Sequence, residues 1–405
     1  MDVQIGRRQM LAGLGAAGLS LARPRTGISM SAPAGTVAIG RCRTYDGAAV
    51  LSTLETAFDQ LGGLGRLVKG KTVSIKLNLN GGPNRRLGYL PLEETHFPHP
   101  VLVGAAMQLM GKAGAQRVRV LECAWAPSTA PLEDHLMEAG WDWRLLVGTV
   151  PKVEFENTNF LGTGKKYSRF KVPFGGFLYP AYDLNHCYED CDVFISITKP
   201  KDHSTTGVTM GMKNIFGTTP LTLYGSGLGV DKDNEAMELP RNGRMDILHY
   251  GKRQPSSLAL PEIDPKSSRD DGYRIPRCIV DLVAARPVHL TIIDAVLSMA
   301  GGQGASLRCV QTKPGLIVVG NNPVSTDAVM TALMNYDPAA EKGQTPFVTC
   351  DNTMALGESV GLGTRDLNRI EVVGGSIKDN ICDYLALRKA REARPAPGFE
   401  RTRRT

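Results

Sequence analysis

The sequence lacks the cysteine spacing that metal and redox proteins commonly use. Its eight cysteines are scattered over 405 residues, and neither a C-x2-C pair nor the iron–sulfur run C-x2-C-x2-C-x3-C occurs. The closest pair is Cys187-x3-Cys191, preceded by His186, and no second pair completes four ligands, so no metal site is predicted. The spacing is also unlike that of a small disulfide scaffold, so the fold should not depend on disulfide bonds.

Two further absences limit the class of protein. After residue 34, no segment is long and apolar enough to cross about 30 Å of hydrocarbon as a helix, so no transmembrane segment is expected. The net charge of +7 comes from the ends, because four basic residues and one acid precede residue 35 while seven basic residues and two acids follow residue 387. Residues 35–387 therefore carry a net charge of −1, which gives no support for a nucleic-acid partner.

The chain begins with an arginine pair and a short apolar run. Arg7-Arg8 precedes the weakly apolar, glycine-rich segment 10–22, which is too short to span a membrane and rich in glycine for an ordinary amphipathic helix. This arrangement predicts a removable signal peptide that is read by the Tat translocase, with cleavage after Ala34 or Ala22. We therefore expect a periplasmic or secreted protein with a signal at 1–34, and a disordered basic tail at 388–405.

The body of the chain, 35–387, predicts an α/β fold in one elaborated domain or two lobes. A strand at 72–80, a helix at 100–113 and a strand at 117–123 form a β-α-β unit, which indicates a mostly parallel sheet flanked by helices. The continuous apolar run at 192–198 is typical of a buried strand. Segment 150–177 predicts β-hairpins or irregular structure, and 228–273 predicts a long irregular insertion. The other predicted strands are 288–295, 315–320 and 370–373, and the other predicted helices are 48–64, 131–140, 275–285, 323–334 and 347–360.

Polar residues gather where the predicted strands end. Ligands of open parallel sheets bind outside the carboxyl ends of the strands, and cations, hydroxyls and amides in such a place are costly to desolvate unless they meet an anion. Glycines in the same segments would let the backbone approach a small carboxylate or phosphate. An alternative is that the lysines are solvated and the hydroxyls cap a helix. The candidate ligand-binding residues are Lys76, Asn78, Lys199, Lys201, Thr206, Thr209, Asn214, Asp294, Gly301, Gly302 and Asp327.

Two residues in this set of segments are candidates for catalysis. His203 is a candidate general acid or base, because the ordinary pKa of imidazole is near neutrality. If Lys213 is buried beside Lys199 and Lys201, burial and like charge would lower its pKa and make it a base or nucleophile. Asp294 and Asp327 could orient a cation or the lysines, and Asp327 could instead act as a first-turn acid on a helix dipole.

One string resembles the hallmark of the uncharacterised DUF362 family: Lys199-Pro200-Lys201-x-His203-x5-Thr209-x3-Lys213-Asn214-x2-Gly217. The resemblance extends over most of residues 70–375 in the expected order, including 75–78, 294–302, 320–329 and 361–374. It implies that these positions form one site and implies little about the reaction. Some relatives carry a ferredoxin-like segment and this chain has none, so electron transfer is not carried over. The loop 302–305 also departs from the usual Gly-x-Gly-Pro.

Three functions stay open from the sequence, and the cofactor is unknown. The first is an enzyme acting on a small anionic substrate, whose plan is distantly similar to that of the lactate-racemase family. The second is a solute- or cofactor-binding protein, which fully salt-bridged lysines would favour over a pKa-perturbed lysine and histidine. The third is a metalloprotein, suggested by His96-x2-His99, although the prolines around this pair favour a turn and a helix cap.

Overall fold

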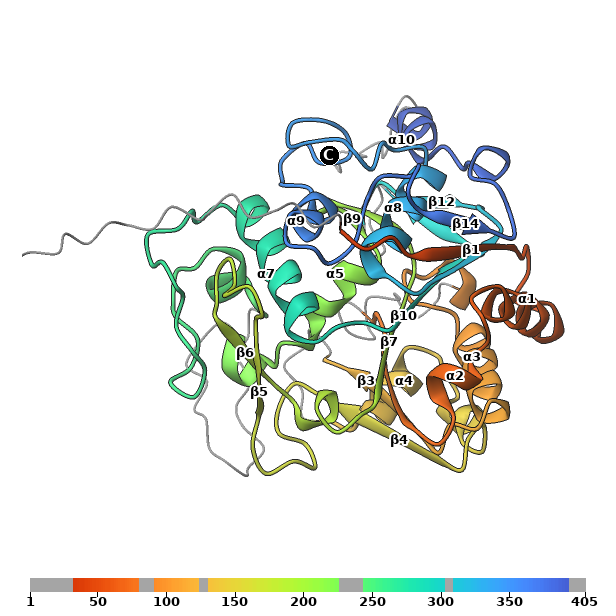
Figure 1. The fold of residues 1–405 in the computed structure, drawn as a ribbon, viewed down its shortest axis with the longest axis horizontal. Coiled ribbons are helices and arrows are strands. Elements are labelled where there is room, and N and C mark those ends of the chain that lie inside the picture. The colour runs from red at the N-terminus through yellow and green to blue at the C-terminus, as the bar shows by residue number, and fades with distance from the viewer. Residues whose placement is uncertain (1–31, 80–90, 124–129, 226–242, 303–308, 393–405) are drawn as a thin grey trace, which may run out of the picture. The chain divides into compact units, whose positions relative to one another are not determined.

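The computed structural model describes residues 32–392 apart from 80–90, 124–129, 226–242 and 303–308 (Figure 1). The predicted signal falls outside the described residues except for its last three, Ala32 to Ala34. The described residues from Ala32 onward belong to one compact unit. Within the described part, no helix has the length and apolar character needed to cross a membrane.

The centre of this unit is an eight-stranded sheet. Strands β10, β7, β2, β3 and β4 run parallel in that order, and β13 is antiparallel to both of its neighbours, β10 and β1. The edge strand β14 is parallel to β1. The prediction of a mostly parallel α/β sheet is confirmed. Across the sheet, the strands are β14 (Glu371–Val373), β1 (Thr36–Arg41), β13 (Leu316–Gly320), β10 (Leu290–Ala295), β7 (Val193–Thr198), β2 (Thr72–Lys76), β3 (Arg117–Glu122) and β4 (Lys152–Asn157).

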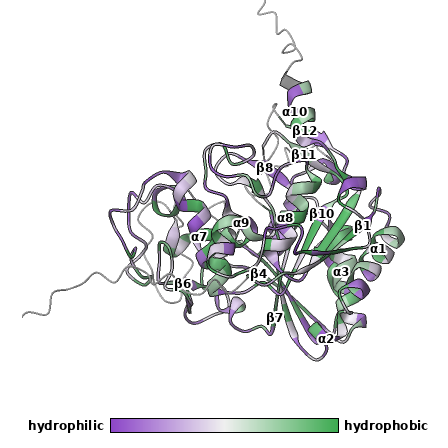
Figure 2. Cartoon of the chain, turned by 45° about the horizontal axis from the view of Figure 1, so that its top comes forward, coloured by the Kyte–Doolittle hydropathy of each residue, from purple (hydrophilic) through white to green (hydrophobic). Residues whose placement is uncertain are grey.

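Helices cover both faces of the sheet (Figure 1). Helices α1 (Gly47–Gln60), α3 (Pro100–Lys112) and α4 (Leu132–Glu138) pack on one face, and α5 (Gly211–Ile215), α7 (Asp271–Ala285) and α8 (Pro323–Leu333) pack on the other. Successive strand residues point to opposite faces, so Ile292 lies in the first core and Ile293 in the second. Figure 2 shows the central strands as hydrophobic, as expected for strands that are buried on both sides.

The β-α-β unit formed by β2, α3 and β3 has the predicted order. The side chain of His99 accepts a hydrogen bond from the backbone N–H of Val101 at the start of α3, and Pro100 occupies the first helical position. Proline is well suited to this position because its fixed φ matches the helix and its missing N–H would be unpaired there. The cap and the proline together fix where α3 begins, immediately before the residues that pack on β2.

A second sheet of four short strands was not predicted. Its order is β12 (Val310–Thr312), β11 (Ser298–Ala300), β8 (Lys201–His203) and β9 (Gly207–Thr209). Each of these strands has three residues, which is too short for an alternating pattern to be recognised. As a result, Lys201 and His203 lie on a strand instead of a loop, on the same face of β8 because side chains alternate.

Several predicted boundaries were wrong. The strand from 72 ends at Lys76 instead of residue 80, and the helix predicted over 347–360 is confined to α9 (Thr353–Ser359), which Asn352 caps. The predicted insertion at 228–273 ends earlier, because Met245–His249 forms a π-helical turn and α7 begins at Asp271. Residues 388–392 of the predicted tail belong to helix α10 (Tyr384–Glu392), and 393–405 lie outside the described residues.

Segment 150–177 contains β4, which joins the main sheet, and β5 (Ser168–Lys171), which pairs with β6 (Ala181–Leu184). All eight cysteines are free thiols, as the prediction of a disulfide-independent fold requires. The remaining helices are short: α2 (Gly65–Val68), α6 (Leu221–Tyr224) and the single turns 92–94, 143–146, 186–188, 216–218 and 378–380.

Candidate functional site

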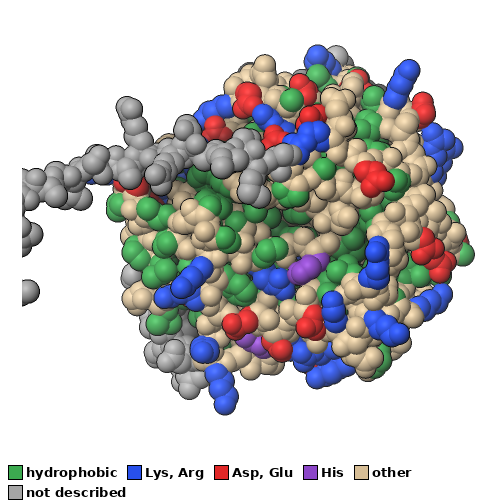
Figure 3. Space-filling model, viewed as in Figure 1, with side chains coloured by type: hydrophobic (Ala, Val, Ile, Leu, Met, Phe, Trp, Pro, Cys, Tyr) green, Lys and Arg blue, Asp and Glu red, His purple; other side chains and the backbone are tan. Residues whose placement is uncertain are grey.

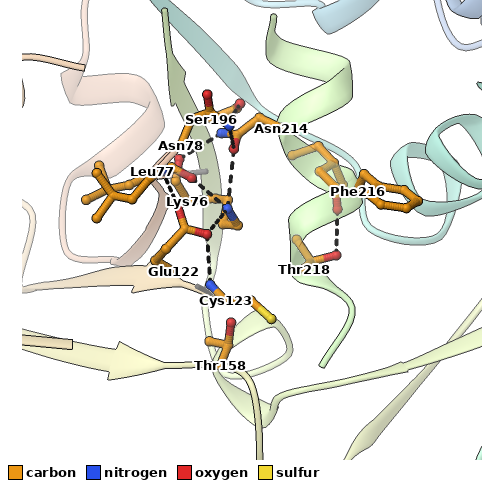
Figure 4. Close-up of polar contacts among 12 residues, drawn as sticks. Lys76, Leu77, Asn78, Glu122, Cys123, Thr158, Ser196, Asn214, Phe216 and Thr218 are labelled. Atoms are coloured by element: carbon orange, nitrogen blue, oxygen red, sulfur yellow. Dashed lines mark hydrogen bonds and ion pairs between the residues drawn. The ribbon is translucent and has the colours of Figure 1, made fainter. Parts of the chain in front are cut away.

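The candidate site lies at the carboxyl edge of the central sheet. Lys76, Glu122 and Thr198 are the last residues of β2, β3 and β7, which are adjacent and parallel. Helix α5 packs against β7 and brings Lys213 and Asn214 to the same edge. Figure 4 shows Lys76 between Glu122 and Asn214. The predicted convergence of the early strand with the 199–214 segment is therefore present.

Lys76 is held in a buried ion pair. Its Nζ donates to Glu122 Oε1 at 2.6 Å, to the Leu77 carbonyl at 2.6 Å and to Asn214 Oδ1 at 3.3 Å. Glu122 also accepts hydrogen bonds from two backbone N–H groups, those of Leu79 and Cys123. Both charges are therefore fully hydrogen-bonded, which is the condition under which a buried ion pair is tolerated.

The two asparagines of the site join β2, β7 and β8. The Nδ2 of Asn214 donates to Ser196 Oγ at 3.0 Å and to the Lys76 carbonyl at 3.1 Å, while its Oδ1 accepts from Asn78 Nδ2 at 3.4 Å. Lys201 Nζ in turn donates to Asn78 Oδ1 at 2.6 Å and to the His96 carbonyl at 2.8 Å. A continuous polar network thus runs from Lys201 through both asparagines to Lys76.

Lys199 is also hydrogen-bonded within the protein. Its Nζ donates to the carbonyls of Glu93 and Thr95, each at 3.1 Å, and lies 5.6 Å from the centroid of the Tyr45 ring. Burial lowers the pKa of Lys199, and burial together with the charges of Lys199 and Lys213 lowers the pKa of Lys201 well below its usual value. Burial therefore disfavours the charged form of both amines, and for Lys201 the neighbouring lysines add to this effect.

Lys213 differs from these three lysines in its contacts. Its half-buried amine lies 4.9 Å from the centroid of the Phe216 ring, and it makes no hydrogen bond or ion pair with any residue that the structure describes. Burial and the positive charges of Arg244 and Lys76 lower the pKa of Lys213 to about 7. The predicted lowering is confirmed, although Arg244 and Lys76 supply the like charges in place of Lys199 and Lys201.

His203 is a neutral ring with a defined tautomer. Its Nδ1 accepts from the backbone N–H of Thr205 at 3.1 Å and contacts the Thr205 hydroxyl at 2.9 Å. Because a backbone N–H can only donate, the proton of the neutral ring sits on Nε2. Burial and the charges of Lys213 and His249 lower the pKa of His203 well below its ordinary value. The sequence suggested His203 as a general acid or base, and this role stays a prediction.

Arg244 and His249 complete the surroundings of Lys213. Arg244 donates to the hydroxyl of Thr219 at 2.6 Å and to Cys123 Sγ at 2.7 Å, and its guanidinium lies 5.9 Å from the Phe216 ring. The His249 ring contacts Phe216 edge-on at 5.7 Å. Burial and the charges of Lys213 and Arg244 lower the pKa of His249 to about 3. The side chains of Lys213, Arg244 and His249 therefore all lie around the Phe216 ring.

Sequence reasoning missed Glu122, Arg244 and His249. Glu122 could have been found, because it ends a predicted strand beside the one that delivers Lys76. Arg244 and His249 lie in the segment that was predicted as an irregular insertion, and nothing in its sequence marks them as neighbours of α5.

Several predicted ligand-binding residues support the framework in this structure. Asp327 lies on α8 and accepts from the backbone N–H groups of Gly211 and Met212, both at 2.9 Å, so it caps α5 instead of acting on its own helix. Burial raises its pKa to about 7. Asp294 accepts from the Tyr45 hydroxyl and the His99 N–H, each at 2.8 Å, and so joins β10 to the start of α3.

The remaining predicted residues lie around the small sheet. Gly301 donates its N–H to Asp202 at 2.5 Å, and both Gly301 and Gly302 have positive φ values, 91° and 138°, which favour glycine. The Thr206 hydroxyl donates to the Val208 carbonyl at 3.0 Å. The hydroxyl of Thr209 is buried without a hydrogen-bond partner among the described residues, which makes it available to a ligand.

The His96-x2-His99 pair has a structural role at the start of α3. His99 caps the helix and stacks on Tyr45 with ring centroids 3.8 Å apart, and His96 is buried against Phe97. Neither belongs to a group of three potential metal ligands within the described ranges. The interpretation as a turn and a helix cap is confirmed for His99.

Comparison with known proteins gives distant relatives. The chain is 23% identical over 328 residues to the thylakoid-associated protein sll1697 of Synechocystis, a match that covers 81% of this chain and 80% of the relative.

Two solved structures give weaker matches. One, a structural-genomics target from Thermotoga maritima, has a TM-score of 0.32, 14% identity, and coverage of 65% of this chain and 55% of the other. The other, the lactate racemase apoprotein of Thermoanaerobacterium thermosaccharolyticum, has a TM-score of 0.29, 13% identity, and coverage of 69% and 54%. This chain thus spans little more than half the length of either structure.

The family assignment rests on a match to a family model. A family model described as a domain of unknown function, DUF362, matches residues 73–332. That range begins in β2 and ends in α8, so it contains Lys76, the lysine-rich segment after β7, helix α5 and Asp327. The chain therefore belongs to the DUF362 family.

Proposed function

We propose that this protein is an enzyme that acts on a small anionic ligand, a carboxylate or a phosphate, at the carboxyl edge of the central sheet. The observation that carries the proposal is the contrast between four lysines. Lys76, Lys199 and Lys201 donate to acceptors of the protein, whereas the amine of Lys213 has no hydrogen bond among the described residues and a pKa of about 7. An amine of this kind is suited to accept a proton or to attack a carbonyl carbon.

The charges at the site favour an anion. Within the described ranges, five basic side chains meet at this edge, against the two buried carboxylates of Glu122 and Asp294. Burying cations is costly, and the lowered pKa values of Lys199, Lys201 and Lys213 are a consequence. An anionic ligand would compensate these charges. The basic residues are Lys76, Lys199, Lys201, Lys213 and Arg244.

The structure suggests a role for each functional group. Neutral Lys213 acts as base or nucleophile, and His203, an imidazole within electrostatic range of Lys213, is the second catalytic residue. The Thr209 hydroxyl and the glycine turn at 301–302 supply further polar contacts to the ligand. The hydrogen-bonded network joins β2, β7 and β8, and its lysines contribute positive potential around Lys213. Its members are Lys76, Asn78, Lys201 and Asn214.

A binding protein without catalysis is the second candidate. It is favoured by the salt bridge of Lys76 and by the hydrogen bonds of Lys199 and Lys201 to acceptors of the protein, since groups committed to the protein take no part in a reaction. The two candidates differ in what Lys213 does, because a binding protein needs its charge whereas an enzyme needs its neutral amine. Binding with no turnover at any pH would favour the second candidate.

The test uses Lys213→Met and a matched control, Lys252→Met. Lys252 also lies over an aromatic ring, 5.1 Å from the Tyr250 centroid, but is exposed. Thermal unfolding is measured with acetate, malate, citrate, inorganic phosphate and glycerol phosphate, and each binder is then followed by NMR for a product. A ligand should raise the unfolding temperature of the unaltered protein and of Lys252→Met, and both should form product, whereas Lys213→Met should form none. Product formation by Lys213→Met would overturn the proposal.

We also propose that the chain is exported through the Tat translocase to the periplasm or the exterior. The support is the Arg7-Arg8 pair followed by a short apolar run. Replacing both arginines by lysine should leave the precursor in the cytoplasm, whereas the matched change of Arg23 and Arg25 to lysine should leave export in place. Normal export of the Arg7→Lys, Arg8→Lys precursor would exclude this route.

A further inference from the structure

A cluster of potential metal ligands lies apart from the proposed active site, around the one close cysteine pair of the sequence. Glu156 is on β4, and His186 and Cys187 are in the single helical turn that follows β6. One ligand atom from each of the three lies within 4.8 Å of the other two. We propose that Glu156, His186 and Cys187 bind a Zn²⁺ ion through one oxygen, one nitrogen and one sulfur atom. This inference does not depend on the proposed function.

The distances fit a tetrahedral ion. Zn²⁺ bonds of about 2.0–2.1 Å to nitrogen, 2.0–2.2 Å to oxygen and 2.3 Å to sulfur place tetrahedral ligand atoms about 3.4–3.6 Å from one another. His186 Nε2 lies 3.6 Å from Cys187 Sγ and 3.9 Å from Glu156 Oε1. These two distances exceed the tetrahedral spacing by only a few tenths of an ångström, and Cys187 Sγ and the Glu156 carboxylate lie within 4.8 Å of each other.

The loop that faces the cluster makes room for two of the ligands. A Cβ atom added at Gly162 would lie 1.7 Å from Glu156 Oε1, and one added at Gly164 would lie 2.4 Å from His186 Cδ2. Gly162 also has a φ of +57°, which favours glycine. Between them, Thr163 donates its backbone N–H to Glu156 Oε1 at 3.0 Å and places its hydroxyl 3.3 Å from Glu156 Oε2. The loop is thus shaped around the carboxylate and the imidazole.

Asn185 fixes the position of the cysteine relative to this loop. Its Oδ1 accepts the N–H of Cys187 at 2.9 Å, and its Nδ2 donates to the carbonyls of Phe160 and Leu161 at 3.0 and 3.3 Å. The nearby guanidinium of Arg119 is already paired with Glu154 and Asp190, so it adds little positive charge against a cation. The donor atoms are therefore held in place before an ion arrives.

The fourth position would be open. Three protein ligands with a fourth position for water are typical of reactive zinc sites, whereas purely structural sites usually have four protein ligands. Cys191, the other member of the sequence pair, does not supply the fourth ligand. Its thiol donates to the Tyr188 carbonyl at 3.5 Å and accepts from Arg286 Nη2 at 3.0 Å. The His186 side chain is 24% exposed, so an ion bound here is accessible from solvent.

The experiment titrates the full chain with Zn²⁺ by calorimetry and with Co²⁺ by absorption. The unaltered protein should bind one ion and show the thiolate-to-cobalt charge-transfer band in the near ultraviolet. Cys187→Ser should lose this band, and His186→Gln, whose side chain is partly exposed and should not affect folding, should weaken Zn²⁺ binding by more than about 100-fold. Thr163→Val removes the hydroxyl beside the Glu156 carboxylate and should weaken Zn²⁺ binding by about 10- to 100-fold.

Cys191→Ser is the matched control, since it removes a neighbouring thiol that is directed elsewhere. It should bind Zn²⁺ as the unaltered protein does, and circular dichroism should show that all four variants are folded. The proposal is overturned by unaltered Zn²⁺ affinity in His186→Gln, by a charge-transfer band that survives Cys187→Ser, or by equal losses in Cys191→Ser. Absence of saturable binding to the unaltered chain would also overturn it.

Discussion

Lys201 Nζ and Asn78 Oδ1 lie 2.6 Å apart and join the small sheet to the end of β2, 123 residues away in the sequence. Lys201 is fully buried, and its amine also donates to the His96 carbonyl. Asn78 is therefore one of the two acceptors that the described residues provide for this amine. Both Lys201 and Asn78 were predicted as ligand-binding groups, and the contact shows that each is the other's partner in the folded protein.

Replacing Asn78 by Leu should destabilise the protein. The change keeps most of the side-chain volume but removes one acceptor of a buried amine, for which we expect a loss of about 1–3 kcal/mol in the free energy of unfolding. Asn78→Asp keeps an acceptor and should cost less. Urea unfolding measures both variants, and a Leu variant as stable as the unaltered chain would show that Lys201 gains nothing from this contact.

The Lys76–Glu122 pair should be strongly coupled. Lys76→Met leaves a buried carboxylate without its cation, and we expect a loss of about 3–5 kcal/mol. Glu122→Gln in the same chain should recover part of that loss, because the charge that has lost its partner is then removed. The measurement is a double-mutant cycle of unfolding free energies. The exposed pair of Arg144 and Asp142 is the control, and breaking it should change stability little.

Much of the sheet could be predicted from the sequence. Strands such as 193–198 are apolar over their whole length, because helices cover both faces, and α3 carries a proline and a cap at its start. The antiparallel insertion of β13 between β1 and β10 could not be predicted, because strand direction leaves no trace in a five-residue apolar run. The small sheet was missed because three residues carry no periodicity.

The site could be located from the sequence, but its internal contacts could not. Reading the strand ends identified Lys76, Asn78, Lys201 and Asn214, which do form one network. Figure 4 shows three of them, Lys76, Asn78 and Asn214, and on the face seen in Figure 3 basic and acidic side chains are interspersed. Sequence cannot show whether a lysine meets a ligand or a carbonyl of its own chain, and Lys199 meets two carbonyls. Arg244 belongs to another segment of the chain, and no local sequence pattern shows that folding brings it to the site.

Asp327 should make stability depend on pH. Burial raises the pKa of its carboxyl to about 7 in the folded protein, compared with about 3.9 in an unfolded chain. The contribution of Asp327 to the free energy of unfolding is fully present below about pH 4 and is lost as the pH rises towards 7. The loss is about 1.4 kcal/mol per pH unit, because in this window the Asp327 carboxyl ionises only in the unfolded state. Asp327→Asn cannot ionise, so its stability relative to the unaltered chain should rise over the same window.

The control for Asp327 is Asp46→Asn, which alters an exposed cap carboxylate on α1. This carboxylate is exposed, so the Asp46→Asn variant removes one acid without altering a buried group and supplies the baseline for the comparison. Unfolding by urea at intervals between pH 4 and 8 provides the comparison. A constant difference between Asp327→Asn and the unaltered protein would mean that the Asp327 carboxyl ionises as readily in the folded chain as in water.

Lys213 should react as an amine at neutral pH. Because burial, Arg244 and Lys76 lower its pKa to about 7, the rate of its arylation by trinitrobenzenesulfonate should rise up to about pH 7 and then level off. The rate for a lysine with the ordinary pKa of about 10.4 keeps rising towards pH 10. Arg244→Met removes one neighbouring positive charge and should shift the Lys213 midpoint upwards. Peptide mass spectrometry assigns each rate, and a Lys213 midpoint near 10 in the folded protein would remove the basis for its proposed role as base or nucleophile.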